Sequence, residues 1–571
     1  MLTSETSKKA LEQYELDHLD RIRSATLNSF TLAKLPEWIE SRTTLEGAPF
    51  SFKNHEYQLQ ILRDESREIV VKKCSQVGIT ELAIRRTLGI LDILPDIHCI
   101  YTLPTSKFAG QVVKTRFNPV IENSQYLRSR ANREIDSAEM KQIGSSYLYI
   151  KGTIGTAAAI SVPASLLVHD EVDFSDQEVL SNYQSRMTHS RYKMKFKLST
   201  PTIENYGIDG DFKRSRRFYN FCKCHHCGHH FLPDYFSHVK VPDYTGDLRE
   251  ITKENLHNVR YQEAQLLCPR CGKEPDLSPE NRQWVLENPN EAHVAAGYQI
   301  SPFDAPAIIT PGYLVEASTK YKRYVDFVNF GLGQTAEDKD NALTAKEVED
   351  LFIPGEAPTF ASYVIGVDLG LTMHIVIAGV TSDGVMYVVH LERVSLGMFH
   401  ERFADLISKF YISNGVFDSQ PYTDLVMNVQ SKHHKIYGAV YIRSKSTELF
   451  TVTDRDEDLD NSKLPIKLVN INRNKAFDMV MAEMRNKKIV FSLAKTLKEK
   501  DTLVRHVTDM KRMQKFDQDN ELVFNWEKSA DGNDHYHHAL LYCWVAAQMR
   551  GFGGVQTPMG PLVRTFKNKT M

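Results

Sequence analysis

The segment EIVVKKCSQVGITELAIRRTLGIL, residues 68–91, decides the fold of the first half of the chain. An apolar run leads into a short loop ending in Gly78, and a helix-like pattern with Thr80 in its first turn follows. In such a strand–loop–helix unit, loop amides and the helix N-terminus bind phosphate groups. The usual lysine after the second glycine is absent, but Lys73 at the start of the loop can still reach the β- and γ-phosphates. We predict a nucleotide site formed by Lys73, Ser75, Gln76, Gly78 and Thr80, with Thr80 as a Mg²⁺ ligand. An ordinary strand-to-helix turn is the alternative.

Two further strands support the nucleotide site. The apolar run SLLVHDEVDF, residues 165–174, carries Asp170 and Glu171 at its end, where ATPases of this kind place a Mg²⁺-supporting aspartate and a water-polarising glutamate. The run KFKLSTPT, residues 195–202, ends in Ser199 and Thr200, which suit a γ-phosphate sensor. Upstream, Tyr57 could stack on adenine while Gln58 reads the edge of the base, although Tyr57 as a plain core aromatic is an equal alternative.

Composition sets limits on the class of protein. The chain has 571 residues, 42% hydrophobic and 25% charged, so we expect a soluble protein with three or four domains. Its N-terminus is polar and charged, and no apolar stretch approaches the roughly 20 residues of a membrane span, which favours a cytoplasmic location. The net charge of −2 shows no basic excess, so any DNA contact must use local patches.

Five of the eight cysteines fall within residues 222–271. Two C-x2-C pairs, each followed by glycine, predict a tetrahedral structural Zn²⁺ site formed by Cys224, Cys227, Cys268 and Cys271. Other residues crowd the first pair and are alternative ligands: Cys222, His225, His226, His229 and His230. Two unrelated turns with free thiols would produce the same pattern.

A second set of acids lies in the C-terminal half. Asp368 ends the apolar run YVIGVD, Asp418 ends GVFD, and Asp534 opens the helix-like stretch DHYHHALLYCWVAAQ. His538 follows Asp534 by one helical turn, and Glu392 is a rival for the middle acid. Carboxylates gathered from separate elements can hold two divalent metal ions that activate water, as in RNase-H-like nucleases. We therefore predict one metal-dependent nuclease site with Asp368, Asp418, Asp534 and His538 as Mg²⁺ or Mn²⁺ ligands.

These motifs, taken in order, resemble the large terminase subunits of tailed bacteriophages, most closely the lambda-like branch. The resemblance rests on HEYQLQIL, KKCSQVGITE, YTLPTSKFA, LLVHDEVD and LSTPT, and on paired cysteine knuckles after them. It implies that Lys73, Gly78 and Thr80 bind phosphate and Mg²⁺, that Asp170 supports the metal, that Glu171 is the catalytic carboxylate, and that Ser199-Thr200 couples hydrolysis to motion. It also implies a final D-H-x-x-D-A-x-x-Y helix, in which His538 replaces the second aspartate.

The predicted fold class is α/β, with a phosphate-loop ATPase domain, an RNase-H-like nuclease domain and a zinc ribbon between them. The predicted segments are an N-terminal helical region at 1–45 (a possible small-subunit contact), the ATPase domain at 46–220, the zinc module at 221–275, a helical connector and linker at 276–356, the nuclease domain at 357–550, and a flexible basic tail at 551–571. The acidic run at 453–460 is expected to be a solvated loop.

The resemblance implies an ATP-driven motor that packages double-stranded DNA into a procapsid and a nuclease that cuts concatemeric DNA. Expected cofactors are ATP, Mg²⁺ or Mn²⁺, and Zn²⁺. Expected partners are DNA, the small terminase subunit, the portal and further copies of the chain in a ring, in the host cytoplasm and without a membrane. Two alternatives stay open: a zinc-stabilised DNA-binding or structural protein with degenerate ATPase and nuclease sites, and a DNA helicase or repair ATPase.

Overall fold

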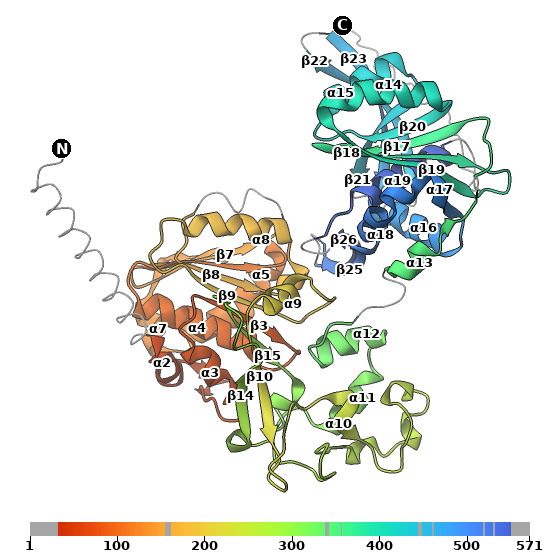
Figure 1. The fold of residues 1–571 in the computed structure, drawn as a ribbon. Coiled ribbons are helices and arrows are strands. Elements are labelled where there is room, and N and C mark those ends of the chain that lie inside the picture. The colour runs from red at the N-terminus through yellow and green to blue at the C-terminus, as the bar shows by residue number, and fades with distance from the viewer. Residues whose placement is uncertain are drawn as a thin grey trace, which may run out of the picture. The chain divides into compact units, whose positions relative to one another are not determined.

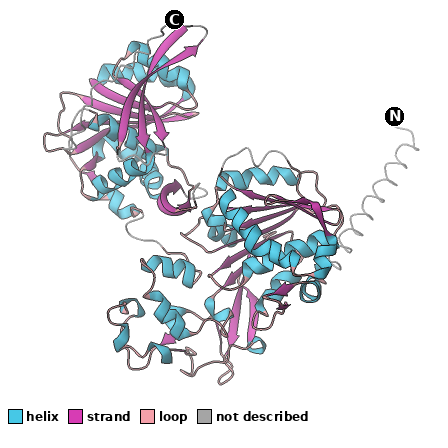
Figure 2. Cartoon of the chain, turned by 180° about the vertical axis from the view of Figure 1, so that it is seen from behind, coloured by secondary structure: helices cyan, strands magenta, loops and turns pink. Residues whose placement is uncertain are grey.

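The computed structural model describes residues 32–154, 162–336, 342–355, 357–442, 448–459, 462–517, 520–528 and 532–549. It divides into two compact units, Met1–Glu337 with Gln514–Val523, and Asp338–Met513 with Phe524–Met571. In each unit helices flank a central sheet (Figures 1 and 2). No helix in the described part of the chain is long and apolar enough to cross a membrane. Most of the predicted N-terminal helical region and the predicted tail from 551 lie outside the described residues.

The first unit is built on a sheet of 11 strands with a parallel centre. Its central order is β15 (Ala296–Ile300), β3 (Glu68–Lys73), β9 (Met194–Ser199), β8 (Leu166–Asp170), β4 (His98–Leu103) and β7 (Ser146–Gly152), with each neighbouring pair parallel. The outer strands are β5 (Ala131–Asp136), β6 (Met140–Ile143), β10 (Arg216–Lys223), β11 (His230–Phe231) and β14 (Arg282–Leu286). Because the central strands are buried on both faces, their apolar runs are nearly continuous. The predicted parallel sheet is confirmed.

The predicted boundaries of the connector are wrong at both ends. β14 and β15 come from the stretch expected to be mostly helical, yet β15 pairs in parallel with β3, placing Tyr298 beside Val71. Helices α11 (Pro311–Ser318) and α12 (Tyr324–Asp326) do follow. Farther on, β16 (Phe352–Ile353) already pairs with β24 (Ile489–Ser492) of the second unit. A strand as short as AGYQI carries little periodic signal, and its assignment depends on a partner far away in the sequence.

The second unit contains a nine-stranded sheet in the order β16, β24, β19 (Met386–Ser395), β18 (Thr372–Val380), β17 (Tyr363–Asp368), β20 (Ile412–Asp418), β21 (Ile436–Ile442), β23 (Ser462–Asn472) and β22 (Phe450–Leu459). β17, β18 and β19 are antiparallel neighbours, whereas β20 runs parallel to β17 and β21 parallel to β20. The flanking helices are α14 (Phe399–Lys409), α15 (Thr423–Lys432), α16 (Arg473–Arg485), α18 (Lys500–Thr508) and α19 (His535–Gln548). The second predicted α/β unit is therefore confirmed as a mixed α/β sheet.

The acidic run is a strand and not the predicted loop. Residues 453–459 lie within β22, which pairs antiparallel with β23 along its whole length. A run of charged residues has no apolar alternation from which a strand can be read. The pairing with the following strand supplies the backbone hydrogen bonds that local composition does not reveal.

Helix α19 packs directly against β17, and Gly366 makes this close approach possible (Figure 1). A Cβ at Gly366 would lie 2.1 Å from the carbonyl oxygen of Ala539 and 2.2 Å from the backbone nitrogen of Cys543. Cys543 Sγ also lies 3.6 Å from the carbonyl oxygen of Val364. Because the obstructing atoms belong to the backbone, side-chain rotation cannot relieve the clash.

We therefore expect Gly366→Ala to reduce the free energy of unfolding by about 1–3 kcal/mol, the usual cost of overpacking a core. Gly397→Ala is the matched control, because a Cβ there meets nothing within 4 Å. Chemical denaturation of both variants measures the difference. Equal stability of the two variants would show that α19 can move away from β17 without cost.

Candidate functional site

The phosphate loop, residues 74–78, is held by the helix that precedes its strand. From α3 (Tyr57–Arg63), the Tyr57 hydroxyl donates to the carbonyl oxygen of Val77 at 2.6 Å, and Gln58 Nε2 donates to the same oxygen at 3.1 Å. Gly78 has a φ of 68°, and a Cβ there would lie 3.0 Å from Gln58 Nε2. At the start of α4 (Ile79–Ile93), glycine is therefore favoured for two reasons: the backbone is left-handed, and Gln58 leaves little room for a Cβ.

The predicted loop residues differ in what they offer a phosphate group. Gln76 is exposed with a φ of 63°, and Thr80 is half-buried in the first turn of α4. The amide of Ser75 donates to the carbonyl oxygen of Phe330 at 2.7 Å, so this amide is engaged by the protein. Tyr57 is buried, which leaves little ring surface for stacking on adenine, whereas Gln58 Oε1 is buried with no hydrogen-bond partner in the described residues.

Lys73 and the Asp170–Glu171 pair meet at the carboxyl ends of β3 and β8, the two strands on either side of β9. Lys73 Nζ lies 3.3 Å from Glu171 Oε1, and the Tyr101 hydroxyl donates to Asp170 Oδ2 at 2.8 Å. Burial disfavours the charged form of Lys73, but the charges of Glu171 and Asp170 outweigh burial and raise its pKa. Burial and the neighbouring Glu171 raise the pKa of Asp170 to about 7. Asp170 Oδ1 is buried and has no hydrogen-bond partner among the described residues, so it is an acceptor to which a cation would bind.

β9 lies between β3 and β8, and its end therefore faces both Lys73 and Glu171. Ser199 Oγ lies 3.5 Å from Glu171 Oε2 and 2.8 Å from the carbonyl oxygen of Thr200. Thr200 is buried, and no described residue is a hydrogen-bond partner of its hydroxyl. The order of the strands thus brings together the lysine, the acids and the hydroxyls predicted from separate motifs.

Asp173 is a residue that the motif reading missed as a contributor to this region. Its carboxylate accepts hydrogen bonds from the backbone nitrogen and hydroxyl of Thr202, both at 2.7 Å, and from the backbone nitrogen of Ile208 at 2.7 Å. Burial raises the pKa of Asp173 to about 7. The side chain ties the segment after β8 to the segment after β9, just beyond Glu171, whose φ of 56° is left-handed. In the sequence, only its place at the end of the DEVD segment, residues 170–173, could have pointed to Asp173.

The four predicted cysteine ligands converge in the first unit. Cys224 Sγ lies 3.7 Å from Cys271 Sγ, Cys227 Sγ lies 3.7 Å from Cys268 Sγ, and all four sulfurs lie within 4.8 Å of one another. Sulfurs about 2.3 Å from a tetrahedral ion are about 3.8 Å apart, so the spacing fits a shared metal ion. The two knuckles are alike, with Gly228 at a φ of 69° and Gly272 at 67°.

The alternative ligands of the first knuckle lie outside this group of four sulfurs. Cys222 Sγ lies 3.8 Å from the carbonyl oxygen of Asp276, and His225 Nδ1 accepts from the Asp276 backbone nitrogen at 3.0 Å. Neither Cys222 nor His225, His226, His229 or His230 belongs to the group that could share one ion.

In the second unit, Asp368 and Asp418 end adjacent parallel strands. Val367 pairs with Phe417, so the two acids follow at the same edge of the sheet, as predicted from the sequence. Burial raises the pKa of Asp418 to about 6, and the nearby charge of Asp368 contributes a smaller increase. The rival acid Glu392 is paired with Arg402 at 2.9 Å and with His390 at 2.9 Å, and is thus already neutralised.

The predicted ligands on α19 lie one helical turn apart, as expected, and contact each other. Asp534 Oδ2 lies 3.2 Å from His538 Nε2, and the other ring nitrogen of His538 is hydrogen-bonded to the Tyr441 hydroxyl at 2.6 Å. Both ring nitrogens of His538 are therefore hydrogen-bonded, and its role as a metal ligand stays a prediction. Burial opposes the charged form of Asp534, but His538 outweighs burial and lowers the pKa of Asp534.

Two histidines that the sequence reading passed over lie beside Asp368 instead. His535 Nδ1 lies 2.9 Å from Asp368 Oδ2, a hydrogen bond that raises the pKa of His535. His374 faces Asp368 across β17 and β18, and burial lowers its pKa to about 3. His535 could have been proposed from the sequence because it follows Asp534 directly. His374 could not, because only the pairing of β17 with β18 places it beside Asp368.

Residues 54–288 match the family model for the ATPase domain of the phage terminase large subunit gpA. This segment of the chain is therefore similar to that ATPase domain. The matched terminase segment contains both the phosphate loop and all four clustered cysteines. It also runs beyond the predicted end at 220 through β14, in agreement with the sheet described above.

Solved terminase structures similar to the chain share little sequence with it. The HK97 bacteriophage large terminase is 12% identical, with 89% of this chain and 98% of that chain covered and a TM-score of 0.47. A large terminase from a thermophilic bacteriophage is 11% identical, with 92% and 99% covered and a TM-score of 0.30. The human cytomegalovirus terminase nuclease domain is 12% identical, with 37% and 93% covered and a TM-score of 0.20. A search of curated proteins gives no match.

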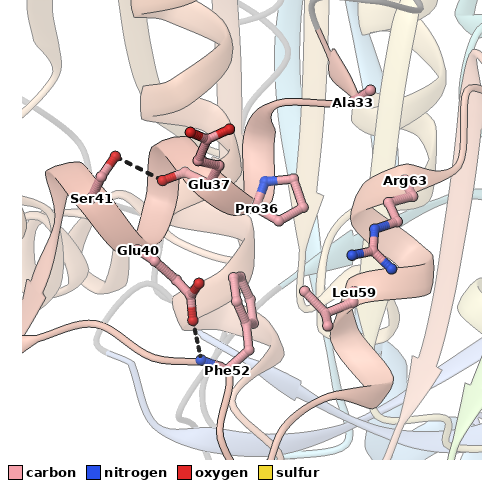
Figure 3. Close-up of a pocket in the computed structure, with 8 residues that line it drawn as sticks. All are labelled: Ala33, Pro36, Glu37, Glu40, Ser41, Phe52, Leu59 and Arg63. Atoms are coloured by element: carbon pink, nitrogen blue, oxygen red, sulfur yellow. Dashed lines mark hydrogen bonds between the residues drawn. The ribbon is translucent and has the colours of Figure 1, made fainter.

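A separate pocket of about 670 Å³ lies between α2 (Leu35–Arg42) and α3 of the first unit (Figure 3). It is lined by Ala33, Pro36, Glu37, Glu40, Ser41, Phe52, Leu59 and Arg63. Glu40 accepts a hydrogen bond from the backbone nitrogen of Phe52 at 3.1 Å across its wall. None of the lining residues belongs to the phosphate loop or to the carboxylate pair, so this hollow is distinct from the nucleotide site.

Proposed function

We propose that this chain is a large terminase subunit that hydrolyses ATP to drive double-stranded DNA into a procapsid and cuts concatemeric DNA with its second unit. The observation that carries the ATPase part is the meeting of Lys73, Ser199 and Glu171 at the ends of β3, β9 and β8. It occurs within a segment of the terminase ATPase family. Partners proposed with this function are the small terminase subunit, the portal and other copies of the chain in a ring, in the host cytoplasm.

Each residue of the nucleotide site has a role that follows from its surroundings. Lys73 would neutralise charge on the β- and γ-phosphates, and Thr80 and Asp170 would hold Mg²⁺, for which the unpartnered Asp170 Oδ1 is suited. Mg²⁺ would neutralise charge developing on the phosphate oxygens. Glu171 would accept a hydrogen bond from the attacking water and orient it, with Ser199 close enough to respond to loss of the γ-phosphate. Gln58 would offer its free acceptor to the adenine amino group.

In the second unit, Asp368 and Asp418 would hold divalent metal ions for DNA cleavage. Burial is the main cause of the raised pKa of Asp418 and the charge of Asp368 adds to it, and bound cations would offset both effects. Asp534 would add a third carboxylate at the start of α19, where it is hydrogen-bonded to His538. The metal ions would activate water and stabilise the leaving oxygen, as in other two-metal nucleases.

Three assays with the purified chain test the proposed function as a whole. We expect ATP turnover that double-stranded DNA stimulates, cutting of plasmid DNA with Mg²⁺ or Mn²⁺, and displacement of a third strand from a DNA triplex. A translocase strips a triplex strand without separating the duplex, so duplex unwinding would favour the helicase alternative. Absence of both ATP turnover and cutting would favour the alternative of a binding protein with degenerate sites.

We further propose that Cys224, Cys227, Cys268 and Cys271 bind one structural Zn²⁺. Metal analysis of the purified protein should find about one zinc ion per chain. Cys268→Ser should lower zinc content and melting temperature together, because zinc binding is linked to folding. Cys222→Ser is the matched control, since Cys222 is buried nearby but lies outside the four-sulfur group. Full zinc content in Cys268→Ser would contradict this ligand set.

A further inference from the structure

One side chain from each of β17, β18 and α19 converges at the edge of the second sheet. Asp368 is the last residue of β17 and pairs in register with His374 of β18, while His535 is the first residue of α19. One possible ligand atom from each of the three lies within 4.8 Å of the other two. The hairpin between β17 and β18 and the packing of α19 on β17 thus build a compact group of one carboxylate and two imidazoles.

His374 carries an unused coordinating atom in this group. The residue is only 4% exposed, and its Nδ1 has no hydrogen-bond partner among the described residues. Its ring stacks on that of His535, with centroids 4.8 Å apart and an interplanar angle of 13°. Buried polar atoms are nearly always paired, so this unpartnered ring nitrogen points to an absent partner. A metal ion that accepts an imidazole lone pair would be such a partner.

The spacing of Asp368 and His535 suits a common ion. His535 Nδ1 and Asp368 Oδ2 are 2.9 Å apart. Nitrogen and oxygen ligands about 2.1 Å from an ion and at right angles to each other are separated by about 3 Å. The proton now shared by the pair can therefore be replaced by a cation with little movement of either side chain.

We propose that Asp368, His374 and His535 bind a single divalent metal ion and that the two imidazoles favour a first-row transition-metal ion over Mg²⁺. Imidazole suits transition-metal ions, whereas Mg²⁺ is usually bound through oxygen. His538, the histidine expected from the sequence to do this, has both ring nitrogens engaged by Tyr441 and Asp534. The inference rests on the proposed nuclease function for its consequence in catalysis, but the binding of the ion can be measured independently.

The test uses the full chain, with Mn²⁺ as a paramagnetic probe and no nucleotide present. Pulsed EPR of the wild-type complex should detect nitrogen couplings from two imidazoles. His374→Gln should remove one coupling and weaken Mn²⁺ binding by about tenfold or more. His390→Gln is the matched control, because His390 lies on the neighbouring strand β19, is bound to Glu392, and is outside the group. Mg²⁺ should displace Mn²⁺ from the wild type only when present at about tenfold excess or more.

Bound Mn²⁺ without nitrogen coupling, or couplings unchanged by His374→Gln, would overturn the proposal. If His374→Gln lowers the melting temperature so far that binding cannot be compared, His535→Ala provides the same measurement, since the His535 side chain is 42% exposed. Nitrogen couplings in a protein that does not cut DNA would support the metal site while refuting the nuclease function. Efficient cutting without nitrogen couplings would support the nuclease and refute this ligand set.

Discussion

Glu171→Gln is expected to reduce DNA-stimulated ATP hydrolysis by a factor of about 10²–10⁴, the usual contribution of a residue that accepts a proton in the transition state. The amide keeps the size of the side chain but cannot accept the proton of an attacking water as a carboxylate does. Because Glu171 is not predicted to contact the nucleotide directly, a fluorescent ATP analogue should still bind. Steady-state hydrolysis and equilibrium binding separate the two effects.

Glu178→Gln is the matched control for this experiment. Glu178 is exposed in the first turn of α8 (Gln177–Tyr183), seven residues from Glu171, and should leave hydrolysis unchanged. Lys73→Ala should reduce both binding and turnover, since Lys73 faces the carboxylate pair and would contact the phosphates. Full turnover by Glu171→Gln would contradict the assignment of Glu171 as the catalytic carboxylate, and full turnover by both variants would contradict the nucleotide site itself.

Asp368→Ala is expected to remove metal-dependent cutting of DNA while leaving ATP hydrolysis intact. Asp368 takes part in both the proposed carboxylate pair with Asp418 and the proposed histidine group, so its loss should remove metal binding altogether. The residues proposed to hydrolyse ATP belong to the other compact unit, which has its own sheet. Plasmid cutting and ATP turnover are measured on the same preparation.

Glu392→Gln controls for the loss of an acid in the same sheet. Its carboxylate is held by Arg402 and His390, and the variant should therefore cut DNA as the wild type does. If Glu392→Gln loses cutting and Asp368→Ala retains it, the middle acid and the site must be reassigned. Thermal melting of both variants distinguishes loss of the site from loss of the fold.

The sequence by itself determined the elements that carry a strong local pattern. The phosphate loop could be predicted because an apolar run, Gly78 and a helix-like pattern follow one another directly at residues 68–91. The structure then gives Gly78 a left-handed backbone. The cluster of four cysteines could be predicted because each C-x2-C-G segment is a local pattern in the sequence. The acids Asp368 and Asp418 were readable because each ends an apolar strand, and strand ends are where parallel sheets gather functional side chains.

Tertiary structure alone decided features that depend on pairing over long distances. β15 extends the sheet of the first unit by pairing in parallel with β3. The sequence AGYQI alone does not predict this pairing. His374 met Asp368 through the register of β17 and β18, and His535 reached the same carboxylate because Gly366 lets α19 pack closely. His538 contacts Tyr441, which lies on a strand nearly 100 residues earlier, so the sequence could not reveal this hydrogen bond. In each of these cases the sequence shows the residue or strand itself. Its contact partner is decided by the way in which distant helices and strands pack together.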